Sequence, residues 1–162
     1  MPLPGRTGFL SYAHEDTVLV ERFLAPMRPR CSTLRELELD TWWDRRILVG
    51  EGWRAEIARA LETADFGLLA LTPSFLASPY VIEVELPALL AGEKLIFPVG
   101  LEAVDLRRAD LKGLEDRLIF RHHTAGSTRQ LWFAECAGAN RARFCDTLIA
   151  QMVDRMTGAR VS

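Results

Sequence analysis

Cysteine is scarce in this chain, and its spacing argues against two kinds of small domain. The three residues, Cys31, Cys136 and Cys145, are an odd number, stand far apart and form no CxxC pair. Structural zinc sites need closely spaced ligand pairs, and disulfide frameworks need paired cysteines. We therefore expect no metal and no disulfide scaffold, and the cytoplasm is the expected compartment because free thiols are typical of it.

The chain also lacks a strong charge of either sign and a long apolar run. Lys and Arg total 20 against 22 Asp and Glu, a formal net charge of -2, so charge gives no reason to expect a nucleic-acid partner. No apolar stretch is long enough to span a bilayer, and the N-terminus lacks the basic start of a secretion signal. We expect contact with neither nucleic acid nor membrane.

Several familiar catalytic patterns are missing as well. No P-loop, G-x-S-x-G or H-E-x-x-H sequence occurs. The stretch 50–55 (GEGWRA) matches the dinucleotide fingerprint G-x-G-x-x-A, but it follows the second predicted strand, whereas the fingerprint belongs after the first. Its glycines fit a tight loop instead. His122 and His123 are adjacent, so they cannot share one face of an element, and we expect both to be exposed.

What the chain does contain is a regular alternation of apolar strand patterns and amphipathic helix patterns. The predicted strands cover 8–12, 37–43, 64–71, 94–100 and 117–120, and the predicted helices cover 17–27, 54–63, a segment starting at Ser78-Pro79, and 140–156. Pro26 and Pro29 are expected to end the first helix. Such alternation favours a parallel sheet with helices on both faces. We predict an α/β fold, a flavodoxin-like doubly wound five-stranded sheet in the order 2-1-3-4-5, forming one domain over 1–162 with a core of about 7–157.

Glu85 is the most unusual single residue. On a helix over 81–90, an apolar face forms that includes Glu85, while Glu83 projects to the opposite, solvent side. That face is built by Val81, Ile82, Val84, Ala88 and Leu89. Burying an isolated carboxylate is costly, so Glu85 is either paired, for example with Arg45 or Arg46, or functional. Pro87 disturbs a regular helix over the preceding turn, so we expect a bend near Glu85.

Three motifs, in order, resemble those of the TIR (Toll/interleukin-1 receptor) domain, and the resemblance covers about residues 8–97. The stretch 9–16 (FLSYAHED) is similar to its first box. The loop 42–53 (WWDRRILVGEGW) is similar to its second box, the BB loop. The stretch 71–80 (LTPSFLASPY), followed by Glu85-Leu86-Pro87, is similar to the segment leading into the third helix of bacterial members.

The resemblance implies a fold of the kind predicted above and one of two functions. Some TIR domains are enzymes that cleave NAD⁺ between nicotinamide and ribose, giving ADP-ribose or a cyclic isomer. Their essential glutamate corresponds to Glu85, and an aromatic residue near the nicotinamide corresponds to Tyr80. That aromatic residue is usually a tryptophan four residues before the glutamate, whereas Tyr80 stands five before Glu85, so Glu83 remains a second candidate. No cofactor is implied, because NAD⁺ is the substrate.

The implied site lies where the first-strand loop and the BB loop flank the third helix. The positions implied for substrate binding are Phe9, Ser11, Tyr12, Ala13, His14, Trp43, Asp44, Arg45, Arg46, Ile47, Gly50 and Tyr80. Arg45 or Arg46 would meet the pyrophosphate of NAD⁺. Activity in bacterial immune signalling, anti-phage defence or NAD⁺ depletion is implied, with a site that in some members is complete only after assembly. The alternative is a non-enzymatic adaptor or host-mimic module that binds its own copies or other TIR domains through the BB loop.

Overall fold

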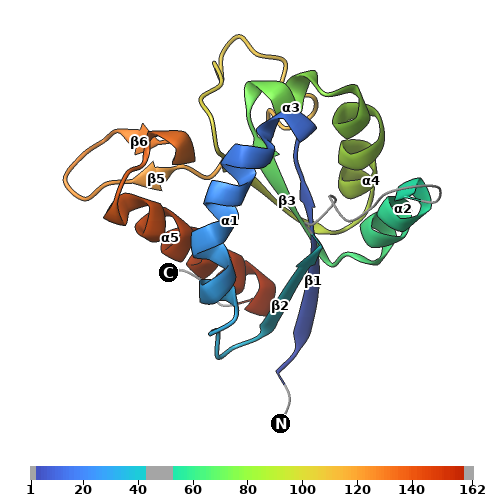
Figure 1. Ribbon diagram of the computed structural model, residues 1–162, viewed down its shortest axis with the longest axis horizontal. Helices are drawn as coiled ribbons and strands as arrows, with labels where there is room; N and C mark the ends of the chain where they lie inside the picture. The colour runs from blue at the N-terminus through green and yellow to red at the C-terminus, as the bar shows by residue number, and fades with distance from the viewer. Residues whose placement is uncertain (1–2, 43–52, 159–162) are drawn as a thin grey trace.

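The computed structural model describes residues 3–42 and 53–158, and Figure 1 shows their arrangement around a central parallel sheet. In chain order the elements are β1 (Gly5–Ser11), η1 (His14–Asp16), α1 (Thr17–Cys31), β2 (Glu38–Trp42), α2 (Trp53–Thr63), β3 (Phe66–Leu71), α3 (Pro73–Ala77), η3 (Val81–Glu85), α4 (Leu86–Ala91), β4 (Leu95–Gly100), β5 (His122–His123), β6 (Gln130–Leu131), η4 (Phe133–Glu135) and α5 (Ala139–Thr157). The predicted α/β alternation is confirmed.

The sheet has the order β2-β1-β3-β4, and all its pairings are parallel. This agrees with the predicted order of the first four strands and with β2 as an edge strand. Every residue of β3 is buried, as the continuous apolar run FGLLAL predicts for a central parallel strand. Parallel strands end at the same edge of the sheet, so the segments that follow β1 and β3 meet there.

Helices cover both faces of the sheet, because successive side chains of a strand point to opposite faces. Leu68 belongs to the hydrophobic cluster under α1 and α5, whereas its neighbour Leu69 belongs to the cluster under α2 and α4. Figure 1 shows α1 and α5 on one side of the strands and α2 and α4 on the other. The chain therefore forms a doubly wound, three-layer arrangement.

The predicted fifth strand over 117–120 is not confirmed, because only one residue of it pairs with β4. Phe120 donates its N–H to the Pro98 carbonyl and accepts a hydrogen bond from the Gly100 N–H, both at 2.8 Å. Phe120 lies opposite Val99, and the residue before Val99 in β4, Pro98, has no N–H to donate. There the Ile96 carbonyl accepts a hydrogen bond from Arg155 Nη1 of α5. The pairing with β4 stops at one bridge because the next donor, at Pro98, is missing and the next acceptor, the Ile96 carbonyl, already has a partner.

The prediction that Pro26 and Pro29 end the first helix was wrong: α1 continues through both prolines to Cys31. Each proline removes one helical hydrogen bond, at a cost of about 3 kcal/mol in a helix interior. One face of α1 offsets this cost by burying five apolar side chains, of which the four larger ones are each worth roughly 1.5–3 kcal/mol. They are Val20, Phe23, Leu24, Met27 and Cys31.

Within residues 3–42 and 53–158, no helix is long and apolar enough to cross a membrane.

The segment after the bridge forms a small antiparallel pair, β5 with β6, which packs beside α5. In it His123 is exposed as predicted, but His122 is buried. The expectation for His122 was wrong because the two residues lie on a strand, where neighbours point to opposite sides, and the inner side faces the Phe144 ring of α5 at 6.5 Å.

Candidate active site

Two polar segments meet at the carboxyl edge of the sheet. β1 ends at Ser11 and is followed by Tyr12, Ala13 and the short helix η1, while β3 ends at Leu71 and is followed directly by Thr72 and α3. Ser11 pairs in register with Leu69 of β3, so the two exits lie side by side. This edge is where ligands bind in open α/β sheets.

A buried pair joins these segments. The Thr72 hydroxyl donates a hydrogen bond to the Asp16 carboxylate and accepts one from the Phe75 N–H at 2.9 Å. Thr72 thereby caps the N-terminus of α3 and ties it to η1. Burial raises the pKa of Asp16 above its ordinary value, and the Thr72 hydrogen bond offsets part of that effect. Neither residue was among the predicted site positions, although Thr72-Pro73, like Ser78-Pro79, is a capping residue followed by a proline, the pattern typical of a helix start.

Glu85 ends a π-helical turn, η3. The Leu86 N–H reaches back to the Val81 carbonyl, five residues earlier, instead of the usual four. Pro87 explains the widened turn, because it has no N–H and leaves the preceding turn without one of its bonds. The bend expected before Pro87 is therefore present as a π turn. Such turns are rare and occur often at functional sites.

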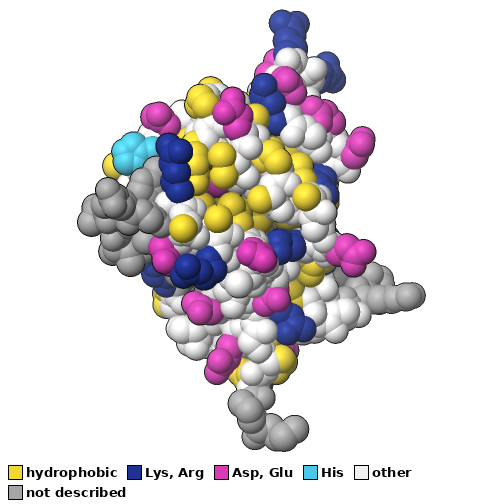
Figure 2. Space-filling view, turned by 90° about the vertical axis from the view of Figure 1, so that its right-hand side faces the viewer, with side chains coloured by type: hydrophobic (Ala, Val, Ile, Leu, Met, Phe, Trp, Pro, Cys, Tyr) yellow, Lys and Arg dark blue, Asp and Glu magenta, His cyan; other side chains and the backbone are white. Residues whose placement is uncertain are grey.

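The π turn changes which side chains face the core. Glu85, Val81, Leu86 and Leu89 are buried, but Val84 is 42% exposed and Ala88 is exposed, contrary to the predicted face. One extra residue in the turn rotates the positions after it relative to a regular helix. Val84 and Ala88 instead line a shallow hollow between α2 and α4, in the face that Figure 2 shows with hydrophobic side chains at its centre and charged ones around them.

Glu85 is completely buried, and its carboxylate accepts a hydrogen bond from the Ser11 hydroxyl at 2.8 Å. Ser11 is also completely buried, so this contact joins the end of β1 to the π turn inside the protein. A hydrogen bond to a carboxylate is stronger than one between neutral groups, which helps to hold the side chain in one orientation. Glu83 is exposed and lies outside this contact, so the geometry separates the two candidate acids.

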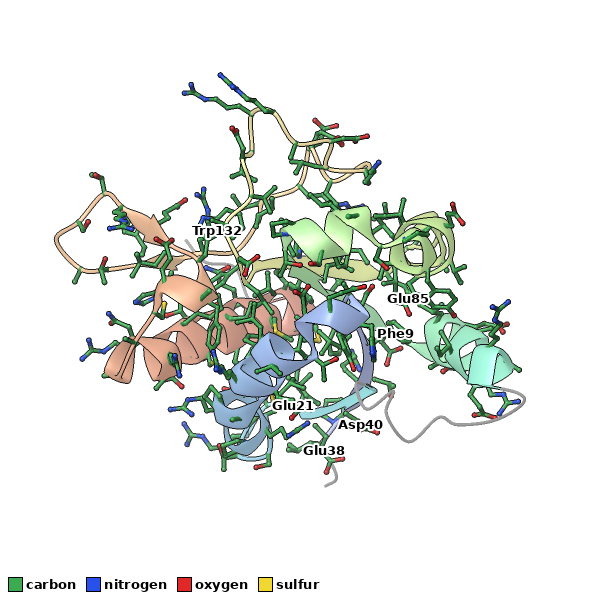
Figure 3. All side chains as sticks on the ribbon, turned by 45° about the horizontal axis from the view of Figure 1, so that its top comes forward. Phe9, Glu21, Glu38, Asp40, Glu85 and Trp132 are labelled. Carbon is green, nitrogen blue, oxygen red and sulfur yellow. The ribbon has the colours of Figure 1, made fainter. Side chains whose placement is uncertain are left out.

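The other predicted positions divide into four groups: buried, half-buried, exposed, and outside the described residues. Phe9, Tyr12 and Ala13 are buried, and Phe9 packs in the cluster under α2 and α4. Tyr80 is half-buried against the same cluster, and His14 is exposed. In Figure 3 Glu85 and Phe9 lie in the same part of the molecule, away from Trp132. The remaining positions, Trp43, Asp44, Arg45, Arg46, Ile47 and Gly50, lie outside the described residues.

Comparisons with known proteins identify the family of this chain. A family model described as the TIR domain matches residues 9–131, which include Ser11, Asp16, Thr72 and Glu85. An uncharacterized protein, y4lF, of Sinorhizobium fredii is 32% identical over 108 residues, which cover 62% of this chain and 32% of that protein.

Two further relatives carry an enzyme name. The 2' cyclic ADP-D-ribose synthase AbTIR of Acinetobacter baumannii is 32% identical over 96 residues, or 56% of this chain and 33% of that protein. The 2' cyclic ADP-D-ribose synthase BtTIR of Bacteroides thetaiotaomicron is 30% identical over 96 residues, or 56% of this chain and 31% of that protein. The chain thus spans about a third of the length of these curated relatives. With a parallel α/β sheet and a family match over most of its length, this chain belongs to the TIR domain family.

Proposed function

We propose that this TIR domain cleaves NAD⁺ at the bond between nicotinamide and ribose, with Glu85 as the catalytic residue. The observation that carries the proposal is a buried carboxylate, held by Ser11 at the end of a π turn, at the ligand-binding edge of the sheet. Two relatives named as 2' cyclic ADP-D-ribose synthases support it.

A single carboxylate is sufficient for this chemistry. When the glycosidic C–N bond breaks, its electron pair goes to the nicotinamide nitrogen, which was cationic and leaves neutral, so no acid must protonate it. Ordinary glycosidases differ because their leaving oxygen needs a second carboxyl group as proton donor. The ribose that remains has oxocarbenium character, and the Glu85 carboxylate would stabilise its positive charge. Water then gives ADP-ribose with release of a proton, and an internal nucleophile gives a cyclic isomer.

The burial of Glu85 places a condition on the proposed reaction, namely that NAD⁺ must gain access to the carboxylate. NAD⁺ must touch the carboxylate, yet Glu85 has no exposed surface in this structure. The proposed reaction therefore requires a rearrangement that uncovers Glu85, and we propose that association with other copies through the BB loop, 42–53, drives it. In this proposal the domain acts in the bacterial cytoplasm, in immune signalling or NAD⁺ depletion, with NAD⁺ and other TIR domains as its partners.

Nicotinamide release from NAD⁺, followed at several protein concentrations with product identification by mass, tests the proposal. We expect activity that rises more steeply than protein concentration. Glu85→Gln should lower kcat by at least about 100-fold, because it removes the charge that stabilises the transition state. Glu83→Gln, a matched change at an exposed neighbour, should retain the wild-type rate. Equal rates for wild type and Glu85→Gln would overturn the assignment of Glu85.

Burial also favours a second candidate, a non-enzymatic module in which Glu85 is structural and the domain works by TIR–TIR association. This candidate predicts no nicotinamide release at any protein concentration. It also predicts that Gly50→Ala abolishes partner binding in sedimentation experiments, while Glu85→Gln leaves binding intact. Both candidates involve TIR–TIR association, so nicotinamide release is the measurement that separates them.

A further inference from the structure

A second polar site lies at the outer edge of β4, away from Glu85. A cleft of about 340 Å³ opens there between β4, the segment 118–123 and α5. Its polar lining consists of Arg121, His123, Gln130, Thr147, Gln151 and Arg155. None of the described residues that line the cleft is a carboxylate. In a chain with a net charge of -2, this is a local concentration of positive charge and hydrogen-bond donors.

One of the cleft's arginines has a buried nitrogen without a hydrogen-bond partner, and the neighbouring His122, which does not line the cleft, has two. In the described part of the chain, the buried side-chain polar atoms with no hydrogen-bond partner are Arg121 Nε and both ring nitrogens of His122. Buried polar groups are almost always hydrogen-bonded, so each exception requires an explanation. Arg121 itself lines the cleft, and its Nε–H is a donor to which no protein acceptor is supplied.

Both guanidinium groups of the cleft are held in place by aromatic rings. Arg155 lies 4.9 Å from the centre of the Phe97 ring and donates to the Ile96 carbonyl at 3.4 Å, and Arg121 lies 5.4 Å from the centre of the Trp132 ring. No ion pair joins either arginine to a carboxylate within residues 3–42 and 53–158. Each guanidinium has five donors in a fixed plane, so most of them remain available in a preorganised arrangement.

We infer that this cleft binds a small molecule bearing a phosphate group, which Arg121 and Arg155 hold together. Arginine pairs recognise phosphate oxygens through several parallel N–H bonds, and a phosphate carries more charge and more acceptors than a carboxylate. Gln130, Gln151 and Thr147 add neutral donors, and the 87% exposed side chain of Leu118 offers an apolar wall. The volume lies at the small end of ligand sites, which suits a mononucleotide or inorganic pyrophosphate. This site is independent of the proposed NAD⁺ cleavage.

A nuclear magnetic resonance titration with inorganic pyrophosphate at low salt tests the inference on the whole chain. Arginine Nε–H groups give side-chain signals of their own, and loss of one signal in Arg121→Lys assigns that of Arg121. We expect a saturable shift of this signal and of the side-chain amides of Gln130 and Gln151. A parallel titration with AMP separates the sources: tighter binding of AMP indicates a nucleotide, and tighter binding of pyrophosphate indicates an inorganic polyphosphate.

Two variants sharpen the test while leaving the contact between Arg121 and the Trp132 ring in place. Gln151→Glu places a carboxylate one helical turn before Arg155, where it pairs with that arginine and repels an anion. Arg155→Gln removes one of the two charges. Each should weaken pyrophosphate binding at least tenfold, whereas Arg108→Gln, at an exposed arginine outside the cleft, should leave it unchanged.

Three results would overturn the inference. The first is the absence of a saturable shift at Arg121. The second is equal weakening by Arg108→Gln, which would mean that only overall charge matters. The third is a set of shifts that depends on protein concentration without added pyrophosphate, which would assign the cleft to contact with a second copy of the chain.

Discussion

The carboxyl edge of the sheet and the outer edge of β4 differ in whether their buried polar side chains have hydrogen-bond partners within the described chain. Five polar side chains are buried in the described part of the chain, and four of them form two pairs at the carboxyl edge: Ser11 with Glu85 and Thr72 with Asp16. The fifth, His122, lies near β4 with neither ring nitrogen hydrogen-bonded. One region thus supplies partners for its acids internally, while the other leaves buried nitrogens without a hydrogen-bond partner in the described part of the chain.

The largest effect should come from breaking the Asp16 pair at its centre. Thr72→Val keeps the shape of the side chain but leaves the Asp16 carboxylate and the Phe75 N–H without the Thr72 hydroxyl. We expect a loss of about 3 kcal/mol in the free energy of unfolding, because each unsatisfied buried group costs roughly 1–3 kcal/mol. Urea unfolding measures it. Thr72→Ser, which retains the hydroxyl, should lose less than about 1 kcal/mol, and equal losses in both variants would contradict the pairing.

The Ser11 pair should affect the reaction rather than the fold, and this prediction rests on the proposed function. Ser11→Ala removes the donor that orients the Glu85 carboxylate. We expect kcat for nicotinamide release to fall about tenfold, equivalent to roughly 1.4 kcal/mol, with KM nearly unchanged. Ser74→Ala, at a half-buried serine of α3, is the control. A rise in KM at constant kcat would indicate that Ser11 binds substrate instead of positioning Glu85.

The unpaired His122 predicts a dependence of stability on pH. Burial, with help from the nearby charges of Arg143 and His123, lowers the pKa of His122 in the folded chain below its ordinary value of 6.5. The unfolded chain then binds a proton more readily, so the free energy of unfolding should decrease as pH falls through 6.5 toward the folded-state pKa. Urea unfolding between pH 8 and pH 5.5 should show this decrease in wild type and a smaller one in His122→Phe. A decrease of the same size in His122→Phe would contradict the prediction, and His14→Gln, at an exposed histidine, is the control.

The smallest effect should come from Asp16→Asn, which tests whether the pair with Thr72 needs the charge of Asp16 or only its hydrogen-bond acceptor. Asparagine still accepts the hydrogen bond from Thr72 but carries no charge to desolvate. Because the pKa of Asp16 is raised in the folded chain, wild type loses stability as pH rises from 3.8 through the folded-state pKa, and the variant does not. At pH 7 Asp16→Asn should therefore be at least as stable as wild type in urea unfolding. A clearly less stable variant would show that the charge itself is required.

Sequence patterns predicted the strands and helices of this fold well because apolar periodicity determined them directly. The burial of β3 and the positions of α2 and α5 followed from such periodicity. The errors arose where a contact distant in sequence decided the outcome. Packing of α1 outweighed Pro26 and Pro29, and the Arg155 contact with β4 closed a position that a fifth strand would have used.

The candidate site was predictable in part for the same reason. The position of Glu85 on an apolar segment and the disturbance by Pro87 were visible in the sequence. The Ser11 contact was not, because it joins residues 74 positions apart and depends on the register of β1 against β3 and on the π turn. Local patterns carry no information about such a distance, so only the folded chain shows which acid lies beside which hydroxyl.

The closed outer edge of β4 has a consequence for a protein that we propose works in assemblies. An unprotected edge strand offers its backbone to any extended segment, and crowded copies can then pair edge to edge and aggregate. Here Pro98 has no N–H to offer and Arg155 occupies the Ile96 carbonyl. Copies brought to high local concentration therefore find neither of these two backbone groups available for pairing at this edge.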